Sequence, residues 1–472
     1  LASHEILAGA VDARGSATNV FSDQAALTGY SRFTASALTL HAGAHLRGTA
    51  GWYGDSAITV ADGAALTLSG NTTSLSTTEI HPAHYFTNGI NLGGANASVH
   101  MAPGSHSFSD VSGLAASVIT LGNAGATASP QTVYAGAVTA AQAGMQIHHD
   151  SRWIITGDST LNSLRANNAI LGFDDKNATR QTFLTQAGSG SMPPLDPPQA
   201  GSPKIAYALA ADTVTASDSV FAFRVDPYSG EHDRLAVATR LEGSGNRLRI
   251  ADFGLPQTTA SVQARESLLL SAPSSTPANL FTLDQAFASS HDDATPAQGD
   301  PWLGGLAVSR DADRRQWWVL SMRGDAPWRV TQDRQFDLVH LPTAGRVELS
   351  RPEADWTPHT LKTDTMIASG VHFALNARPQ SGESDSILIT TLAQGDDNSL
   401  DLSLLLHEPV ALDSAGALLL ATAPLPTADS YFKPGSITQG LTVYSPNLEI
   451  VSTGTQKKWQ LTYKKLPEAL PP

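Results

Sequence analysis

The chain has 472 residues and a formal net charge of −14, with 29 basic and 43 acidic side chains. This balance argues against a nucleic-acid partner, because neutralising phosphates requires a basic stripe. Apolar residues make up 41% and charged residues 15%, beside 39 glycines and 27 prolines, a composition typical of an ordered, turn-rich β protein. No cysteine is present, as suits a protein that crosses an oxidising periplasm and threads unfolded through a pore.

A short pattern repeats along the first part of the chain. Residues 36–44 recur at 56–64, and the pattern returns at 99–104 and 119–125, with a period of about 20 residues. In each unit, apolar residues alternate at period 2, and a turn containing glycine follows. Because such short strands bury little surface alone, we expect them to stack coil upon coil around a shared core. We therefore predict a parallel β-helix over residues 1–152.

A longer segment of the chain is duplicated. Trp153 introduces the first copy and Trp328 the second, which predicts two further segments of one continuous stack, 153–327 and 328–472. Seven residues recur 152 positions later: Phe221, Ala222, Pro227, Ser229, Gly230, Glu231 and Asp233 become Phe373, Ala374, Pro379, Ser381, Gly382, Glu383 and Asp385. Each copy then has an apolar run (268–273 and 418–424) and a basic-aromatic strand (314–318 and 457–459).

Two polar insertions interrupt the second part of the chain. Residues 187–202 contain four prolines, and residues 290–300 are rich in aspartate and alanine. Neither has the periodicity of a strand, so we expect surface loops that protrude from the stack. Binding residues are often found on loops of this kind.

The residues around the duplication resemble the passenger domains of pertactin-like autotransporters. The resemblance rests on the tryptophan-led strand pair at 153–173, the order of residues at 231–250, and its second copy at 385–404. It extends from about Trp153 to Tyr463. The high use of alanine, arginine and histidine, together with one Arg-Gly-Asp triplet, resembles the Bordetella virulence-activated group of this family.

This resemblance implies a right-handed, three-stranded parallel β-helix exported through the outer membrane of a Gram-negative bacterium. A β-barrel translocator of the same full-length chain would be its partner in export. The last tryptophan-led unit, 328–472, would correspond to the autochaperone region of the family. Two such units occur in tandem here, which leaves open which of them is the folding nucleus.

The junction between the two copies holds the candidate binding residues. Arg323-Gly324-Asp325 lies between two strands and precedes Ala326-Pro327, a pattern that predicts an exposed turn of the kind integrins recognise. The alternative is a structural turn. Arg314, Arg315 and Trp317 could form a hot spot of arginine and aromatic side chains, or the tryptophans could pack between stacked coils.

Enzymatic and metal-binding alternatives have weaker support. Gly54-Asp55-Ser56 and Gly157-Asp158-Ser159 lack the glycine that follows a protease nucleophile, and Gly188-Ser189-Gly190 is only part of an esterase motif. The adjacent His148, His149 and Asp150 would point to opposite faces of a strand. No paired carboxylates recur at coil spacing, as a polysaccharide-cleaving β-helix enzyme would need.

These observations predict a non-enzymatic virulence factor without cofactor or metal, displayed on the bacterial surface or secreted, and monomeric. Its partner would be a host protein, either an integrin or a soluble complement regulator such as C1 inhibitor. A β-helix hydrolase, a serine-protease-type passenger and a self-associating biofilm adhesin are the alternatives.

Overall fold

The protein is all-β, and parallel strands dominate its sheets. The computed structural model describes residues 6–8, 12–14, 18–21, 26–28, 32–34, 37–40, 45–48, 57–68, 83–86, 89–113, 116–124, 131–176, 179, 206–227, 229–252, 265–286, 303–323, 326–350, 356–379, 381–405, 416–438 and 444–465. Within these ranges, no helix has the length and apolar character needed to cross a membrane. The predicted fold class, a parallel β-helix, is confirmed.

The chain forms two compact units. Unit 1 comprises residues 1–224, 232–253 and 270–284, and unit 2 comprises residues 225–231, 254–269 and 285–472. The expected segment boundary after residue 152 falls inside a strand, β18, whereas the expected boundary after residue 327 coincides with the start of β29.

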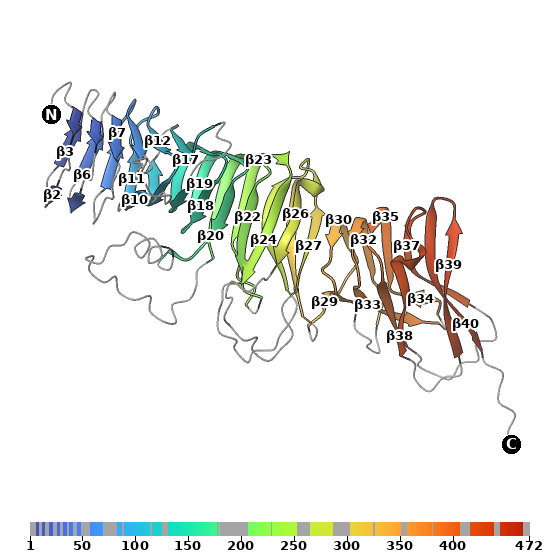
Figure 1. The fold of residues 1–472 in the computed structure, drawn as a ribbon. Helices are drawn as coiled ribbons and strands as arrows, with labels where there is room; N and C mark the ends of the chain where they lie inside the picture. Colours follow the sequence, from blue (N-terminus) through green and yellow to red (C-terminus); the bar gives the residue numbers. More distant parts are fainter. Residues whose placement is uncertain are drawn as a thin grey trace, which may run out of the picture. The chain divides into compact units, whose positions relative to one another are not determined.

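Unit 1 is a stack of parallel coils, coloured blue to green in Figure 1. Its first strands are β1 (Ile6–Ala8), β2 (Asp12–Arg14), β3 (Thr18–Phe21), β4 (Ala26–Thr28), β5 (Arg32–Thr34), β6 (Ala37–Leu40), β7 (His45–Gly48), β8 (Ala57–Val60), β9 (Ala65–Leu68), β10 (Ala83–Phe86), β11 (Gly89–Leu92), β12 (Ser98–Met101), β13 (Ser105–Phe108), β14 (Val111–Gly113), β15 (Val118–Leu121) and β16 (Thr132–Ala135). Each strand pairs with the strand one coil away, as the repeat predicts: β6 lies on β8 with an offset of 20 residues.

The later coils of unit 1 have longer strands. They are β17 (Val138–Ile147), β18 (Ser151–Ile155), β19 (Ser159–Asn167), β20 (Ile170–Phe173), β21 (Ala208–Ser217), β22 (Val220–Val225), β23 (Arg234–Ser244), β24 (Asn246–Asp252) and β26 (Phe281–Ala286), with a 3-10 turn, η1 (Ala278–Leu280), before the last. Strand β25 (Arg265–Pro273) contributes residues to both units, and the last residues of β22 and β26 also belong to unit 2. At β17, two strands of the coil become one, since its first half pairs with β14 and its second half with β15.

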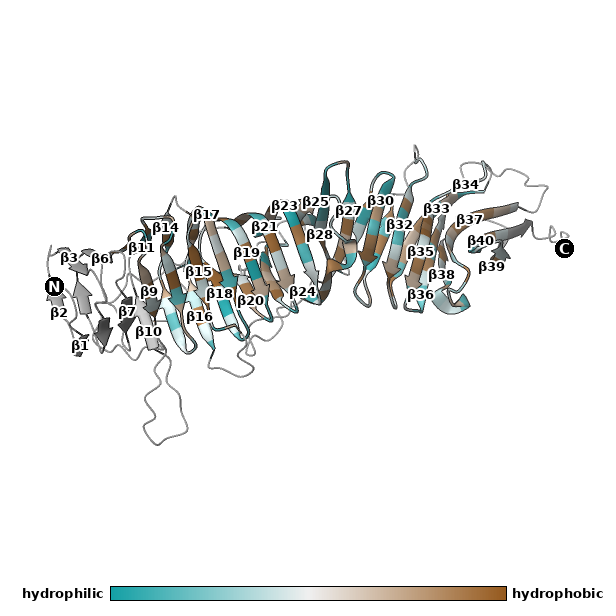
Figure 2. Cartoon of the chain, turned by 90° about the horizontal axis from the view of Figure 1, so that it is seen from above, coloured by the Kyte–Doolittle hydropathy of each residue, from teal (hydrophilic) through white to brown (hydrophobic). Residues whose placement is uncertain are grey.

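The core of unit 1 is a set of apolar ladders that follow the pairing register. Every second residue along a strand is buried, and Figure 2 shows the resulting alternation of apolar and polar bands. One ladder runs through seven coils with no member more than 3% exposed: Leu66, Val99, Ile119, Met145, Leu164, Val214 and Leu241. Burying a continuous apolar row stabilises the stack, by about 1.5–3 kcal/mol for each large side chain.

Similar repeats do not always stack on one another. Residues 99–104 repeat the pattern of 58–63, yet Val99 in β12 pairs with Leu66 in β9, the next strand of the coil. Strand β8 pairs instead with β11, 32 residues further along the chain. The physical reason is that a coil corner can hold an insertion of any length without disturbing the stacked strands.

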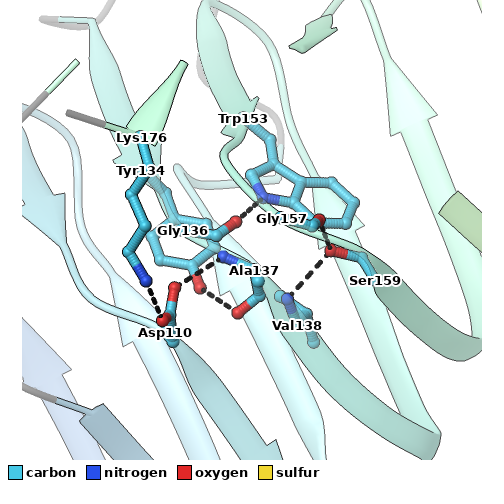
Figure 3. A network of polar contacts seen from close by, with 9 residues as sticks. All are labelled: Asp110, Tyr134, Gly136, Ala137, Val138, Trp153, Gly157, Ser159 and Lys176. Carbon is cyan, nitrogen blue, oxygen red and sulfur yellow. Dashed lines mark hydrogen bonds and ion pairs between the residues drawn. The ribbon is translucent and has the colours of Figure 1, made fainter. Parts of the chain in front are cut away.

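Polar groups at the corners of unit 1 are satisfied across coils (Figure 3). The indole of Trp153 donates a hydrogen bond to the backbone oxygen of Gly136 at 3.1 Å. The carboxylate of Asp110 accepts one from the backbone nitrogen of Ala137 at 2.9 Å and pairs with Lys176. Such links satisfy buried backbone groups that the strand ladders leave unpaired.

Unit 2 contains the antiparallel hairpins β27–β28 and β39–β40, a short antiparallel pair, β33–β34, and parallel coils that follow the first hairpin. Its strands are β27 (Leu303–Arg310), β28 (Arg314–Met322), β29 (Trp328–Val330), β30 (Arg334–His340), β31 (Arg346–Leu349), β32 (Thr360–Ile367), β33 (His372–Arg378), β34 (Glu383–Ser384), β35 (Ser386–Gln394), β36 (Asn398–Leu404), β37 (Gly416–Pro424), β38 (Phe432–Thr438), β39 (Tyr444–Thr453) and β40 (Gln456–Lys465), with a 3-10 turn, η2 (Asp429–Tyr431). Strands β27 and β28 pair antiparallel, and so do β39 and β40.

Equivalent contacts in the two copies support the duplication. Phe221 packs edge-on against Phe281 with ring centroids 5.3 Å apart, and Phe373 packs in the same way on Phe432 at 5.7 Å. The equivalent aspartates, Asp233 and Asp385, are both fully buried. Each copy ends in an antiparallel hairpin whose second strand is the predicted basic-aromatic strand.

Candidate binding site

The β27–β28 hairpin in unit 2 carries the predicted arginine and tryptophan residues. The two strands pair over their whole length, and residues 311–313 connect them. At this tip, the carboxylate of Asp311 accepts hydrogen bonds from the backbone nitrogens of Asp313 at 3.0 Å and Arg314 at 2.6 Å. The tip is exposed, and these bonds hold it in a defined turn.

Two of the predicted binding residues lie on the inner face of β28. Trp317 has no exposed surface, and Arg315 is 7% exposed. Arg315 pairs with Asp337, with 3.3 Å between nitrogen and oxygen, and burial lowers the pKa of its guanidinium while Asp337 opposes that shift. Neither side chain is available to a partner, so we remove both from the candidate surface. Alternation explains this, because residues 315 and 317 share one face of the strand.

The opposite face of β28 carries the accessible side chains. Arg314 and Trp318 are half-buried there, whereas Arg310 at the end of β27 is exposed but pairs with Arg315 and so belongs to the other face. The indole nitrogen of Trp318 donates to the hydroxyl of Ser309 at 3.0 Å, which fixes the ring across the hairpin. The candidate surface therefore consists of Arg314 and Trp318, which we call the hairpin face. The sequence prediction named Arg315 and Trp317 beside Arg314, because alternation alone does not say which face of the strand is buried.

The Arg-Gly-Asp triplet follows directly after β28. Arg323 and Ala326 exchange backbone hydrogen bonds of 2.9 and 3.0 Å. Arg323 is half-buried, whereas Gly324 and Asp325 lie outside the described residues. These two hydrogen bonds join the residues directly before and directly after Gly324-Asp325. The last two residues of the triplet therefore lie between two anchored positions.

The other tryptophans near the junction are core residues. Trp328 is 2% exposed, and its indole donates to Glu266 at 2.8 Å. Trp356 is 5% exposed and donates to the hydroxyl of Ser350 at 2.6 Å. Trp302 lies outside the described residues. The described tryptophans therefore pack between coils, which was one of the two alternatives, except for Trp318, which is half-buried.

The serine at the second protease-like triplet has a structural role. Ser159 is 1% exposed. Its hydroxyl donates to the backbone oxygen of Gly157 and accepts from the backbone nitrogen of Val138, both at 3.0 Å (Figure 3). Asp158 accepts from the backbone nitrogen of Ala208 at 2.8 Å. The other two serine motifs, at 54–56 and 188–190, lie outside the described residues.

The histidine pair lies at a coil corner, as expected. His148 and His149 follow β17, and Asp150 has a left-handed backbone with φ of 58°. Partial burial and the neighbouring His100 lower the pKa of His148. Among the described residues, no group of three or more histidines and carboxylates could hold a metal ion.

Comparison with known families does not assign the chain. No family model matches its sequence. The candidate site is therefore defined by its own geometry: the hairpin face on β28, and the Arg-Gly-Asp triplet that follows the end of this strand.

Proposed function

We propose that this protein is a non-enzymatic bacterial virulence factor, displayed on the cell surface or secreted, that binds a host protein. The proposal follows the autotransporter resemblance in the sequence and is carried by one observation. The Arg-Gly-Asp triplet directly follows an antiparallel hairpin, and its first residue, Arg323, is bonded through the backbone to Ala326, the residue after the triplet. Short anchored turns lose little entropy on binding, which favours recognition by an integrin.

Capture of a soluble complement regulator, such as C1 inhibitor, is the second candidate. The hairpin face supports it, because Arg314 and Trp318 lie on the same face of β28. Arginine and tryptophan are enriched among residues that dominate binding energy at protein interfaces. The two candidates use different residues of unit 2, so substitutions can separate them.

Substitution of the triplet tests the integrin proposal directly. We expect Arg323→Ala and Asp325→Ala to abolish attachment of the purified protein to integrin-bearing cells, while Arg314→Ala leaves attachment unchanged. Capture of C1 inhibitor from serum, measured by pull-down, serves as the second readout. If the triplet variants attach normally, the integrin proposal is contradicted; if only Arg314→Ala and Trp318→Ala lose serum-protein capture, the second candidate replaces it. Turnover of a peptide or glycan substrate would contradict both.

A further inference from the structure

Strand β39 in the second hairpin corresponds to β27 in the first hairpin, and the structure shows which strands pair with β27. Val308 pairs with Trp317 in the first hairpin, and Ile450 pairs with Trp459 in the second. Both residues of the second pair lie 142 positions after those of the first. Strands β27 and β28 therefore correspond, residue by residue, to β39 and β40.

In the first hairpin, β27 is paired on both edges. Strand β28 lies on one side, and β30 lies antiparallel on the other, with Leu306 opposite His340 and Val308 opposite Leu338. Between these two partners, Leu306, Ala307 and Val308 are at most 1% exposed. The first hairpin therefore shows that this edge of β27 can pair with an antiparallel strand over three residues.

In the second hairpin, β39 pairs with β40 alone within the part of the chain that the structure describes. The residues equivalent to the buried trio are Leu448, Glu449 and Ile450. Leu448 is half-buried, Glu449 is exposed, and Ile450 is 39% exposed, one of four large exposed apolar residues among those described. An unpaired edge leaves backbone donors and acceptors that can pair with another strand.

We propose that the free edge of β39 is a second binding site, which takes an extended segment of a partner protein as an antiparallel strand. The segment occupies the place on β39 that β30 occupies on β27. Its apolar residues alternate with polar ones, as buried Phe336 and Leu338 alternate with Gln335 and Asp337 in β30. Main-chain hydrogen bonds supply the affinity, and contacts with Leu448 and Ile450 supply the specificity. This site is independent of the Arg-Gly-Asp triplet.

Two differences between β39 and β27 affect how closely another strand can approach the edge of β39. Asn447 stands where β27 has Gly305, and a Cβ at Gly305 would lie 3.0 Å from the backbone oxygen of His340. Glu449 stands where β27 has Ala307. Both differences hinder the approach of a strand of the β30 type, so Asn447→Gly with Glu449→Ala makes the edge more like that of β27.

The test uses the intact protein and a labelled synthetic peptide of residues 333–341, which contains the β30 sequence. Fluorescence anisotropy is expected to give saturable binding, and a scrambled peptide of the same composition none. Ile450→Lys weakens binding about 10-fold or more, because an apolar contact is lost. Ser452→Lys, which adds the same charge on the same strand outside the three covered residues, leaves binding unchanged. The double variant Asn447→Gly, Glu449→Ala binds more tightly.

Three results would overturn the proposal. The first is equal binding of the scrambled peptide, and the second is equal weakening by Ile450→Lys and Ser452→Lys. The third is a concentration-dependent dimer in analytical ultracentrifugation that Ile450→Lys abolishes while the peptide fails to bind, since a second copy of the chain would then occupy the edge. Unchanged thermal unfolding of the Ile450→Lys variant verifies that its fold is intact, as expected for a partly exposed side chain.

Discussion

Asp233 and Asp385 occupy equivalent positions in the two copies but meet different neighbours. Asp233 receives two hydrogen bonds, of 2.8 and 2.9 Å, from the guanidinium of Arg224. Asp385 receives bonds from the backbone nitrogens of His359 at 2.8 Å and Asn376 at 2.7 Å. The side chains that hydrogen-bond it, Ser350 and Asn376, are uncharged, and burial raises the pKa of Asp385, opposed by these hydrogen bonds.

The raised pKa of Asp385 makes a specific prediction for unit 2. A carboxyl group with a higher pKa in the folded state stabilises the fold at pH below its unfolded value, near 3.8, and this contribution is lost as pH rises through the folded pKa. We therefore expect the urea midpoint of the natural protein to fall, relative to that of Asp385→Asn, as pH increases from about 4. Glu449→Gln, at an exposed position, is the control. A midpoint difference that is constant with pH, or that changes in the opposite direction, would contradict the burial of Asp385.

At the scale of the elements, glycines mark the same bend in both copies. Gly243 in β23 has φ of 132°, and Gly395, which directly follows β35, has φ of 111°. A Cβ at Gly243 would lie 1.5 Å from the backbone oxygen of Ala216, and one at Gly395 would lie 2.1 Å from that of Ala368. At these bends, the coil backbone approaches the preceding coil too closely for any side chain.

Replacing Gly243 with alanine is expected to destabilise unit 1 severely. The matched control is Gly382→Ala, where φ is 72° but no atom lies within 4 Å of the added Cβ. The control should cost only the backbone strain, about 1–2 kcal/mol, and Gly243→Ala should cost more because the strand must also move. Urea denaturation measures both; equal losses would show that the close approach at Gly243 is relieved without cost.

Strand existence was predictable from sequence, whereas strand pairing was only partly so. The alternation at 36–40 and 56–60 predicted β6 and β8 and their offset. The partner of β12, which is β9, did not follow from the repeat, because an insertion at a corner changes the residue count but not the stacking. The antiparallel pairing of β27 with β28 was not predicted either, since a buried strand has the same alternation whichever direction its neighbour runs.

The candidate site illustrates the same limit. The sequence indicated the β28 strand and the Arg-Gly-Asp triplet, but residue type alone did not separate Trp317 in the core from Trp318 on the hairpin face. Only the register of β28 against β27 identifies the accessible side chains. The edge of β39 that has no partner among the described residues was also not predictable from sequence, because it depends on which strands pair.

At the scale of the whole molecule, both units contain parallel stacked coils, and a duplicated segment recurs from one unit to the other. Each copy contains parallel coils, an apolar strand and an antiparallel hairpin, yet the hairpins have different neighbours. A duplicated module keeps the strand pairing between each coil and the next. Because each coil contacts mainly its neighbours, the stability of the stack is approximately a sum of terms from neighbouring coils. Differences between the copies, at Asp385 and at β39, are therefore where new properties arise.

The register of the stack can be tested by disulfide formation, because the chain contains no cysteine. Thr139 and Thr160 are exposed register partners in unit 1, and Thr365 and Leu392 are partners in unit 2. Paired strands place such residues within the distance that a disulfide bridges. The controls move the second cysteine two positions along the same face, to Asn162 and Gln394. Oxidation followed by mass spectrometry is predicted to give complete disulfide formation in both register pairs and little in the controls; equal or greater formation in the shifted pairs would contradict the parallel stack.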